Sequence, residues 1–283
     1  MKILIPLDGS KLAEDALDLA AGLARLWSGE LVVVRVVSPS VAIPAGAPGL
    51  ALQVEKVARE EASDYLETIA RQLTRWGMAG ATRALFGQAV DQIVREAEEE
   101  GVGLICMASH GRSGPARWLL GSVAEGAVRK SPCPVLLCRG EIAADFQGFR
   151  EVIVPVDGSR GSAEVIQRVQ PYLHQSAHLT LVRASEDLVR HSALRLDQVS
   201  YQSYLDALED ELKALDPEDR FGRRVLDCPA AEAIMTLAEE KKADLIAMAT
   251  HGRSGMQRLV LGSVTERVAR HASCPVLAFP LTR

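Results

Sequence analysis

Residues 104–114 read LICMASHGRSG, and residues 245–255 read LIAMATHGRSG. The likeness continues without a gap from Leu104–Leu136 to Leu245–Leu277, and about 20 of the 33 aligned positions are identical. Unrelated segments do not match to this degree. The chain is therefore an internal duplication, and its fold is predicted to be one domain present twice.

A second repeated segment lies near the start of each copy. Residues 3–10, ILIPLDGS, return as residues 152–159, VIVPVDGS. The offset between the copies is 149 here and 141 in the later repeat, so the second copy is about eight residues shorter in its middle. We predict two domains, 1–140 and 149–283, joined by a linker at 141–148, which suits the usual domain size.

Strands and helices alternate within each copy. Lys2–Leu7 is apolar and β-branched, Ser10 caps an amphipathic helix, and Leu31–Val37 is nearly all valine, as in a strand covered on both faces. This alternation predicts an α/β fold with two tandem domains, each a parallel sheet flanked by helices. The other predicted strands are Thr82–Phe86, Gly103–Ala108, Pro134–Cys138, Glu151–Val156, Leu179–Ala184, Gly222–Leu226, Asp244–Ala249 and Pro275–Phe279.

The composition excludes several classes of protein. The 283 residues carry a net charge of −5 and only 4% aromatic residues, which disfavours both a basic nucleic-acid surface and base stacking. No run of 18 apolar residues exists, and the apolar start of the chain is too short for a signal peptide. The five cysteines form no CxxC pair, so reduced thiols are expected. We predict a cytoplasmic protein with no nucleic-acid or membrane partner.

Ligands of parallel α/β sheets bind beyond the carboxyl ends of the strands. After the fourth strand of each copy, Gly111 or Gly252 is followed, after nine intervening residues, by a Gly-Ser pair at 121–122 or 262–263 that opens a helix. Glycines let backbone N–H groups approach an anion, and a helix N-terminus adds unpaired donors and partial positive charge. The pattern favours a phosphate site, although a duplicated helix cap would look the same.

Asp8 and Asp157 each end a first strand and precede Gly-Ser. Such an aspartate can accept a hydrogen bond from a ligand amine or hydroxyl, or help to hold a metal ion. The alternative is a turn-capping aspartate that leads into the first helix. Both interpretations stay open at this point.

These motifs, together with the closing Cys-Pro-Val-Leu strand of each copy, resemble the universal stress protein family in its tandem form. The resemblance covers nearly the whole chain. It implies two Rossmann-like, adenine nucleotide alpha hydrolase-like domains, each with five parallel strands in the order 3-2-1-4-5. It also implies one adenine nucleotide per domain, as ATP, ADP or AMP, with Mg²⁺ left open as an accompanying ion.

The family's phosphate pattern is Gly-x2-Gly-x9-Gly-Ser/Thr, and here Ala108 and Ala249 replace its first glycine. In the first domain the resemblance implies nucleotide contacts from Pro6, Leu7, Asp8, Val36, Met107, Ala108, His110, Gly111, Arg112, Ser113, Gly114, Gly121, Ser122 and Val123. In the second domain it implies contacts from Pro155, Val156, Asp157, Ala184, Met248, Ala249, His251, Gly252, Arg253, Ser254, Gly255, Gly262, Ser263, Val264 and Thr265.

Three functions are compatible with these residues. The leading one is a non-enzymatic, ATP-binding stress regulator, since no residue is identifiable as a positioned general base. The second is slow ATP hydrolysis at the same sites, and the third is a dimerisation or interaction scaffold without nucleotide. Family members pair through their last strands, so Pro134–Cys138 and Pro275–Phe279 are expected to pair within the chain as a pseudo-dimer. A homodimer of whole chains is left open.

Overall fold

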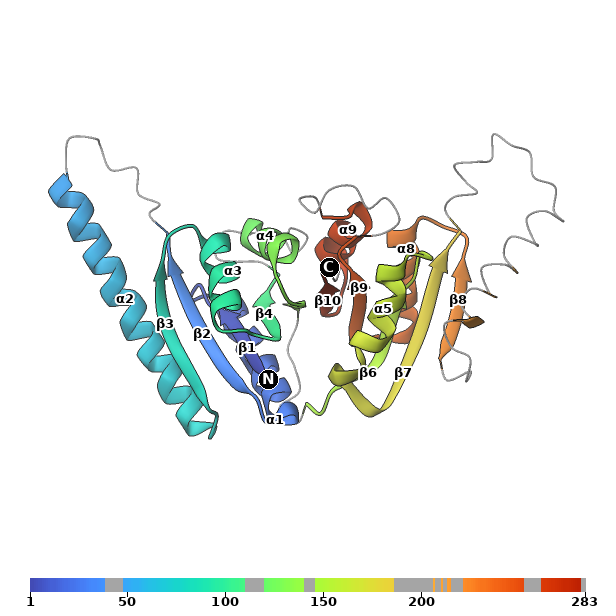
Figure 1. Cartoon of the computed structure of the whole chain (residues 1–283), viewed down its shortest axis with the longest axis horizontal. Coiled ribbons are helices and arrows are strands. Elements are labelled where there is room, and N and C mark those ends of the chain that lie inside the picture. The colour runs from blue at the N-terminus through green and yellow to red at the C-terminus, as the bar shows by residue number, and fades with distance from the viewer. Residues whose placement is uncertain are drawn as a thin grey trace. The chain divides into compact units, whose positions relative to one another are not determined.

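The computed structural model describes residues 1–38, 48–109, 120–139, 146–185, 206, 210, 213–214, 221–251 and 261–280, with the backbone alone at 48–52. The chain divides into two units, Met1–Phe146 and Gln147–Arg283. The division falls inside the segment predicted as a linker. Each unit is an α/β domain with a parallel sheet and flanking helices, which confirms the predicted fold class (Figure 1).

The first domain has five parallel strands in the spatial order β3-β2-β1-β4-β5, the order that the resemblance implies. Its helices lie against the sheet, with α3 packed on α4 (Figure 1). Its elements are β1 (Lys2–Pro6), α1 (Lys11–Trp27), β2 (Glu30–Val37), α2 (Pro48–Arg75), β3 (Gly80–Phe86), α3 (Ala89–Glu99), β4 (Leu104–Ala108), α4 (Ser122–Lys130) and β5 (Val135–Cys138).

The second domain repeats this arrangement with the order β8-β7-β6-β9-β10. The central strand β6 corresponds to β1 and the strand β9 corresponds to β4. Its described elements are β6 (Phe149–Pro155), α5 (Arg160–Arg168), the 3-10 turn η1 (Gln170–Tyr172), β7 (Leu173–Ala184), β8 (Gly222–Leu226), α8 (Ala230–Lys241), β9 (Leu245–Ala249), α9 (Ser263–His271) and β10 (Val276–Phe279).

The first helix differs in length between the domains. Helix α1 has 17 residues, whereas α5 has nine. Pro171 follows α5 and cannot continue it, because proline lacks the N–H and its ring clashes with the preceding turn. Strand β7 then begins at Leu173, six residues before the predicted start, because Leu173 pairs with Phe149 ahead of a register shift.

The core of the first domain is the apolar face between α1 and the central strands. Strand β4 is buried along its whole length, and Leu17 and Leu23 of α1 are fully buried. Two thiols lie in this core, with the sulfurs of Cys106 and Cys138 3.3 Å apart. Burial raises the pKa of Cys106 well above its ordinary value. Both cysteines therefore behave as small apolar groups, as expected for buried thiols.

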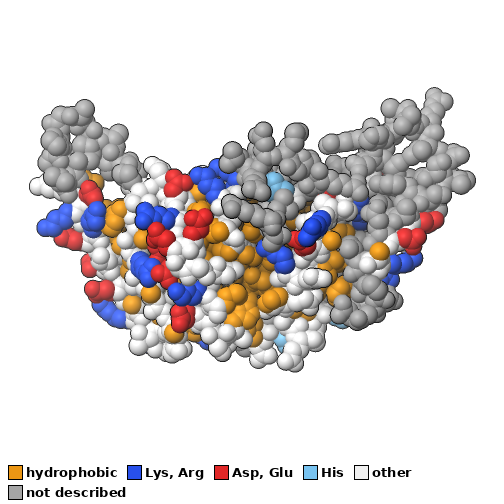
Figure 2. Space-filling view, viewed as in Figure 1, with side chains coloured by type: hydrophobic (Ala, Val, Ile, Leu, Met, Phe, Trp, Pro, Cys, Tyr) orange, Lys and Arg blue, Asp and Glu red, His pale blue; other side chains and the backbone are white. Residues whose placement is uncertain are grey.

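The described surface carries charges of both signs. On the face shown in Figure 2, basic and acidic side chains are interspersed over the first domain. Two of the ion pairs of that domain are Arg95–Glu99 at 2.7 Å and Lys130–Asp91 at 2.8 Å. None of the described helices is long and apolar enough to cross a bilayer.

Candidate functional site

The aspartate that follows the first strand forms a tight corner in each domain. Asp8 accepts a hydrogen bond through Oδ1 from the backbone N–H of Ser10 at 2.9 Å. Gly9 has a φ of 80°, a conformation that glycine adopts without strain. Ser10 in turn accepts a hydrogen bond from the N–H of Ala13 at 3.2 Å and caps α1. The turn-capping role considered for this aspartate is therefore present in the structure.

The second domain repeats this corner. Asp157 Oδ1 accepts a hydrogen bond from the N–H of Ser159 at 3.0 Å, and Gly158 has a φ of 79°. One addition is specific to this domain, because the N–H of Asp157 donates to the hydroxyl of the buried Ser162 at 3.2 Å. Each aspartate is thus held at the end of its strand by its own fold.

Strand register places each aspartate corner beside the end of the fourth strand. In the first domain Ile3 pairs with Leu104, so β1 and β4 run side by side toward the same edge of the sheet. In the second domain Val152 pairs with Leu245 in the same way. The residues that end the fourth strands are buried, namely Met107, Ala108, Met248 and Ala249. A ligand bridging the two strand ends could contact both parts of the predicted site.

A backbone hydrogen bond joins the fourth strand of each domain to the helix after the glycine loop. The N–H of Gly121 donates to the carbonyl of Ser109 at 2.8 Å, and the N–H of Gly262 donates to that of Thr250 at 3.0 Å. Both glycines are N-cap residues with extended backbone, and neither helix has a side-chain cap. The N–H groups of the first three residues of α4 and α9 therefore lack an intrahelical acceptor, and the N-cap glycines offer them no side chain.

These helix starts hold the predicted hydroxyl residues. Ser122 and Ser263 are the first residues of α4 and α9, and both are exposed. Val123 and Val264 follow them and are partly buried. Uncapped N–H groups, an exposed hydroxyl and the positive end of the helix dipole form a donor set that suits a phosphate group.

Thr265, which is predicted to contact the nucleotide, uses its hydroxyl within the fold. This buried residue donates its hydroxyl to the carbonyl of Ala249 at 3.0 Å, which ties α9 to the end of β9. Ala124 stands at the equivalent position of α4. Gly262 is also tightly enclosed, since a Cβ atom there would lie 3.1 Å from the carbonyl oxygen of Thr250. The backbone at this point leaves little room for a side chain.

His251 lies at the end of β9, beside the start of α9. Its Nδ1 is 2.9 Å from the hydroxyl of Thr250, which is buried. Its Nε2 is also buried and has no hydrogen-bond partner in the part of the chain that the structure describes. A ligand with an acceptor oxygen at this strand end would supply one.

Much of the predicted glycine loop lies outside the described residues. Among the predicted residues that are described, Val36 is the last but one residue of β2, and Ala184 is the last residue of β7. The first strand of each domain ends at Pro6 or Pro155, and Leu7 and Val156 follow directly. The predicted residues that fall outside the described ranges are His110, Gly111, Arg112, Ser113, Gly114, Gly252, Arg253, Ser254 and Gly255. Within the described residues, no group of three His, Cys, Asp or Glu side chains could hold a metal ion.

Sequence reasoning missed an arginine near the end of each second strand. Arg35 lies with its guanidinium 4.9 Å from the ring centre of Tyr65, whose hydroxyl donates to Glu14 at 3.2 Å. Burial and the neighbouring Glu14 raise the pKa of Tyr65 above its ordinary range. Arg183, at the equivalent position, is buried and donates to the carbonyl of Val156 at 3.3 Å. Its recurrence in both copies was the signal that could have found it.

Comparison with known proteins gives one consistent result. A model of the universal stress protein family matches residues 1–139 and 148–280. Universal stress protein MJ0531 of Methanocaldococcus jannaschii is 34% identical over 140 residues, which are 49% of this chain and 81% of that protein. Universal stress protein Rv2623 of Mycobacterium tuberculosis is 27% identical over 289 residues, covering 97% of this chain and 95% of that one.

A solved structure shows the same fold over both domains. A universal stress protein from Archaeoglobus fulgidus DSM 4304 superposes with a TM-score of 0.73 at 22% sequence identity. The match covers 99% of this chain and 98% of that chain. At this level of identity the likeness establishes the fold.

Proposed function

The chain belongs to the universal stress protein family, in a form with two family domains, and from this we propose that each domain binds one adenine nucleotide at the carboxyl edge of its sheet. The observation that carries the proposal is the uncapped start of α4 and α9, held to the fourth strand by Gly121 and Gly262. Duplication preserved this donor set in both domains. A family member has been solved in complex with cAMP, which is an adenine nucleotide.

The phosphates are assigned to the helix starts. Ser122 and Ser263 offer hydroxyl donors beside the first-turn N–H groups, which an anion can bind without displacing a side-chain cap. His251 Nε2 adds a buried donor or acceptor in the second domain. The described residues fit a phosphate group because this part of each site offers N–H and O–H donors, and the one acidic residue in each first turn, Glu125 or Glu266, lies three residues beyond the serine.

The nucleoside is assigned to the neighbouring strand ends. Asp8 and Asp157 offer carboxylate oxygens that are already oriented by their own turns. Val36 and Ala184 would flank the base and ribose from the second strands. Ala108 and Ala249, which replace the family's first glycine, are buried at the ends of β4 and β9, so their methyl groups add apolar surface at the floor of the site.

The proposed role is binding, with the nucleotide shifting the protein between states that differ in affinity for a partner. Hydrolysis would need a positioned base. Phosphate release from ATP by the wild-type protein, abolished in an Asp8→Ala/Asp157→Ala variant, would contradict this part of the proposal. The pairing of the two last strands within the chain, and of two chains in a homodimer, stays a prediction.

Charge placed at the helix starts tests the proposal without harming the fold. Glutamate at position 122 or 263 favours the helix dipole but repels phosphate, so Ser122→Glu and Ser263→Glu should fold normally and bind weakly. Ser122→Gln and Ser263→Gln match the glutamates in size and serve as controls. We expect calorimetry with ATP and Mg²⁺ to show two sites in the wild type, one in each glutamate variant, and two in each glutamine variant.

The first measurement is simpler still. Denaturing the purified protein and identifying released nucleotide by chromatography and mass gives the occupancy directly. Adenine nucleotide in the supernatant would support the proposal. Its absence, followed by no binding of ATP in titration, would leave the scaffold function in its place.

A further inference from the structure

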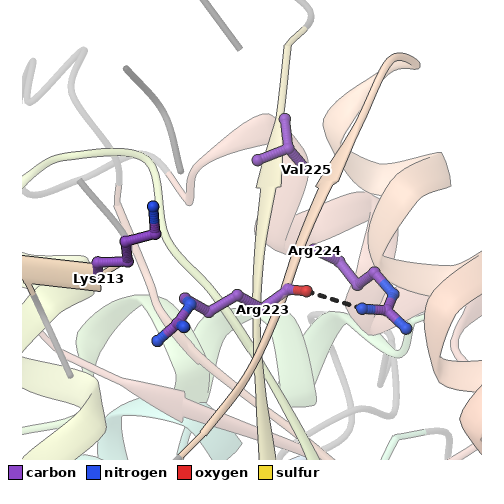
Figure 3. A pocket seen from close by; sticks show the side chains of 4 residues that line it. All are labelled: Lys213, Arg223, Arg224 and Val225. Atoms are coloured by element: carbon purple, nitrogen blue, oxygen red, sulfur yellow. Dashed lines mark hydrogen bonds between the residues drawn. The ribbon is translucent and has the colours of Figure 1, made fainter. Parts of the chain in front are cut away.

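The described residues that line a pocket on the outer strand β8 do not converge on a ligand. The pocket has a volume of about 230 Å³ and is lined by Lys213, Arg223, Arg224 and Val225. Figure 3 shows Arg224 on the opposite side of β8 from Lys213 and Arg223, and Lys213 already pairs with Asp210 at 3.1 Å. A more specific arrangement lies where the chain passes from one domain to the other.

The chain leaves the first domain at a phenylalanine that packs on helix α1. Phe146 is the last residue of the first unit and is partly buried. It lies directly against Gly22 of α1, because a Cβ atom at Gly22 would be 2.9 Å from Cδ1 and 3.3 Å from Cβ of Phe146. A side chain at position 22 would displace the ring, so this close approach requires glycine.

Gly22 lies in a part of α1 that has no counterpart in the second domain. Arg168, the last residue of α5, is nine residues after the N-cap Ser159, as Leu19 is after the N-cap Ser10. Helix α1 continues past that point to Trp27, and Gly22 lies in this continuation. The greater length of α1 therefore provides the surface on which Phe146 packs.

The chain enters the second domain two residues after Phe146. Gly148 is buried with a φ of 105°, and a Cβ atom there would lie 2.6 Å from the backbone nitrogen of His174 and 2.7 Å from the carbonyl carbon of Leu173. The next residue, Phe149, is 1% exposed and pairs with Leu173. The exposed Gln147 is thus left alone between an anchor in each domain.

We propose that Phe146 and Gly22 form a clasp that keeps the connection between the domains at one residue and so restricts the movement of one domain against the other. While Phe146 stays on α1, two Cα steps join the anchors, a span of at most about 7 Å. The described element before it is β5, which ends at Cys138, so release of Phe146 leaves residues 139–147 before Gly148. A flexible chain of nine residues spans about 15–18 Å, which is roughly twice as far. The inference does not depend on nucleotide binding.

The test measures how widely the distance between the domains varies in the full chain. Spin labels are attached at Glu67→Cys and Glu240→Cys, two exposed helix positions, and Cys228→Ser removes the one native cysteine that is not buried. Pulsed electron paramagnetic resonance then gives the distribution of label distances. We expect Phe146→Ala to broaden this distribution about twofold, in line with the longer reach of the released connection.

Gly22→Leu breaks the same contact from the other side, because its side chain fills the place of the ring. We expect it to broaden the distribution as much as Phe146→Ala does, and the two substitutions together should add nothing further. Circular dichroism verifies the fold of each variant. If Gly22→Leu fails to fold, Phe146→Ala decides alone, since Phe146 lies outside the helices and strands.

Val57→Ala provides the control, because it shortens an apolar side chain of the first domain that is 53% exposed and lies on α2. Equal broadening by Val57→Ala would reduce the effect to a general loosening of the first domain and overturn the clasp. An unchanged distribution in Phe146→Ala would show that the domains are restrained elsewhere and would also overturn it. Broadening by Phe146→Ala together with an unchanged distribution in a folded Gly22→Leu variant would overturn the pairing of these two residues.

Discussion

The two domains agree at their strand ends and differ along their flanks. The aspartate corners are nearly superposable in form, with φ values of 80° at Gly9 and 79° at Gly158. The strand-to-helix hydrogen bonds of Gly121 and Gly262 also recur, at 2.8 and 3.0 Å. What has been kept since duplication is mostly backbone geometry, which fixes where donors point. This pattern is typical of a site that binds its ligand largely through main-chain groups.

The flanks show the opposite behaviour. In the first domain Arg83 forms ion pairs with Glu96 and Glu100. In the second domain Leu237 and Lys241 stand at the positions of these two acids. The core thiols of the first domain correspond to Ala247 and Phe279 in the second. The difference indicates that the flanks were free to change once the strand ends were fixed, and three substitutions can sharpen or break that distinction.

The largest effect is expected from Arg83→Leu. The Glu96 side chain is only 6% exposed, so removing the arginine leaves a buried carboxylate without its partner. We expect the first domain to lose about 2–3 kcal/mol of stability, somewhat less than for a fully buried pair because Arg83 is 42% exposed. Hydrogen exchange followed by mass spectrometry reads each domain of the intact chain separately.

Two control variants are designed by comparison with the second domain, where Arg224 of β8 stands at the position of Arg83. Arg224→Leu should change stability by less than about 0.5 kcal/mol, because no carboxylate among the described residues pairs with this arginine and none would lose its partner. Adding Glu96→Leu to Arg83→Leu copies Leu237 of the second domain and should restore most of the lost stability. Equal losses from Arg83→Leu and Arg224→Leu would show that the two flanks are energetically alike despite their different partners.

A smaller effect is expected at the strand end of the second domain. Thr265→Ala removes the buried hydrogen bond to the Ala249 carbonyl and copies Ala124 of the first domain. The expected cost is about 1–2 kcal/mol in the second domain, since a buried acceptor loses its partner. Nucleotide affinity at that domain should stay within about twofold, because the hydroxyl is used by the fold. A large loss of ATP binding with unchanged stability would assign Thr265 to the ligand instead.

Sequence periodicity was sufficient for the architecture because strands and helices here have strong local signals. The helix predicted to open at the Gly-Ser pair 121–122 begins at Ser122 as α4, and the strand predicted at Gly222–Leu226 coincides with β8. The start of β7 was wrong by six residues. The polar stretch after Leu173 becomes a strand only because Phe149 supplies a partner across a register shift, and that pairing is not local.

For the candidate site, the sequence predicted which glycines and aspartates to consider but not the side-chain contacts around them. Spacing and duplication located the glycines and aspartates, since both depend on backbone conformations that few residue types allow. Spacing could not show that Thr265 bonds to Ala249, which depends on how α9 lies over β9. Nor could it show that Arg183 is buried against Val156 whereas Arg35 stacks on Tyr65. Such contacts come from packing between elements.

The smallest effect concerns acid stability. Hydrogen bonds from Lys2 and then Arg83 hold the pKa of Glu100 below its ordinary value of 4.5. A carboxyl group whose folded pKa is lowered stabilises the domain above its unfolded pKa, and this contribution is lost as the pH falls through the folded value. The second domain carries Lys241 at this position and therefore lacks the carboxyl group.

The readout is therefore a difference between variants, because other carboxylates titrate in the same range. Between about pH 6 and pH 3, the first domain of the wild type should lose more stability than that of Glu100→Gln, while the second domain should respond identically in both. Hydrogen exchange again resolves the domains. If Glu100→Gln left the acid response of the first domain unchanged, the ion pairs of Glu100 would contribute nothing measurable to the stability of that domain. The contrast between the flanks would then rest on Glu96 alone.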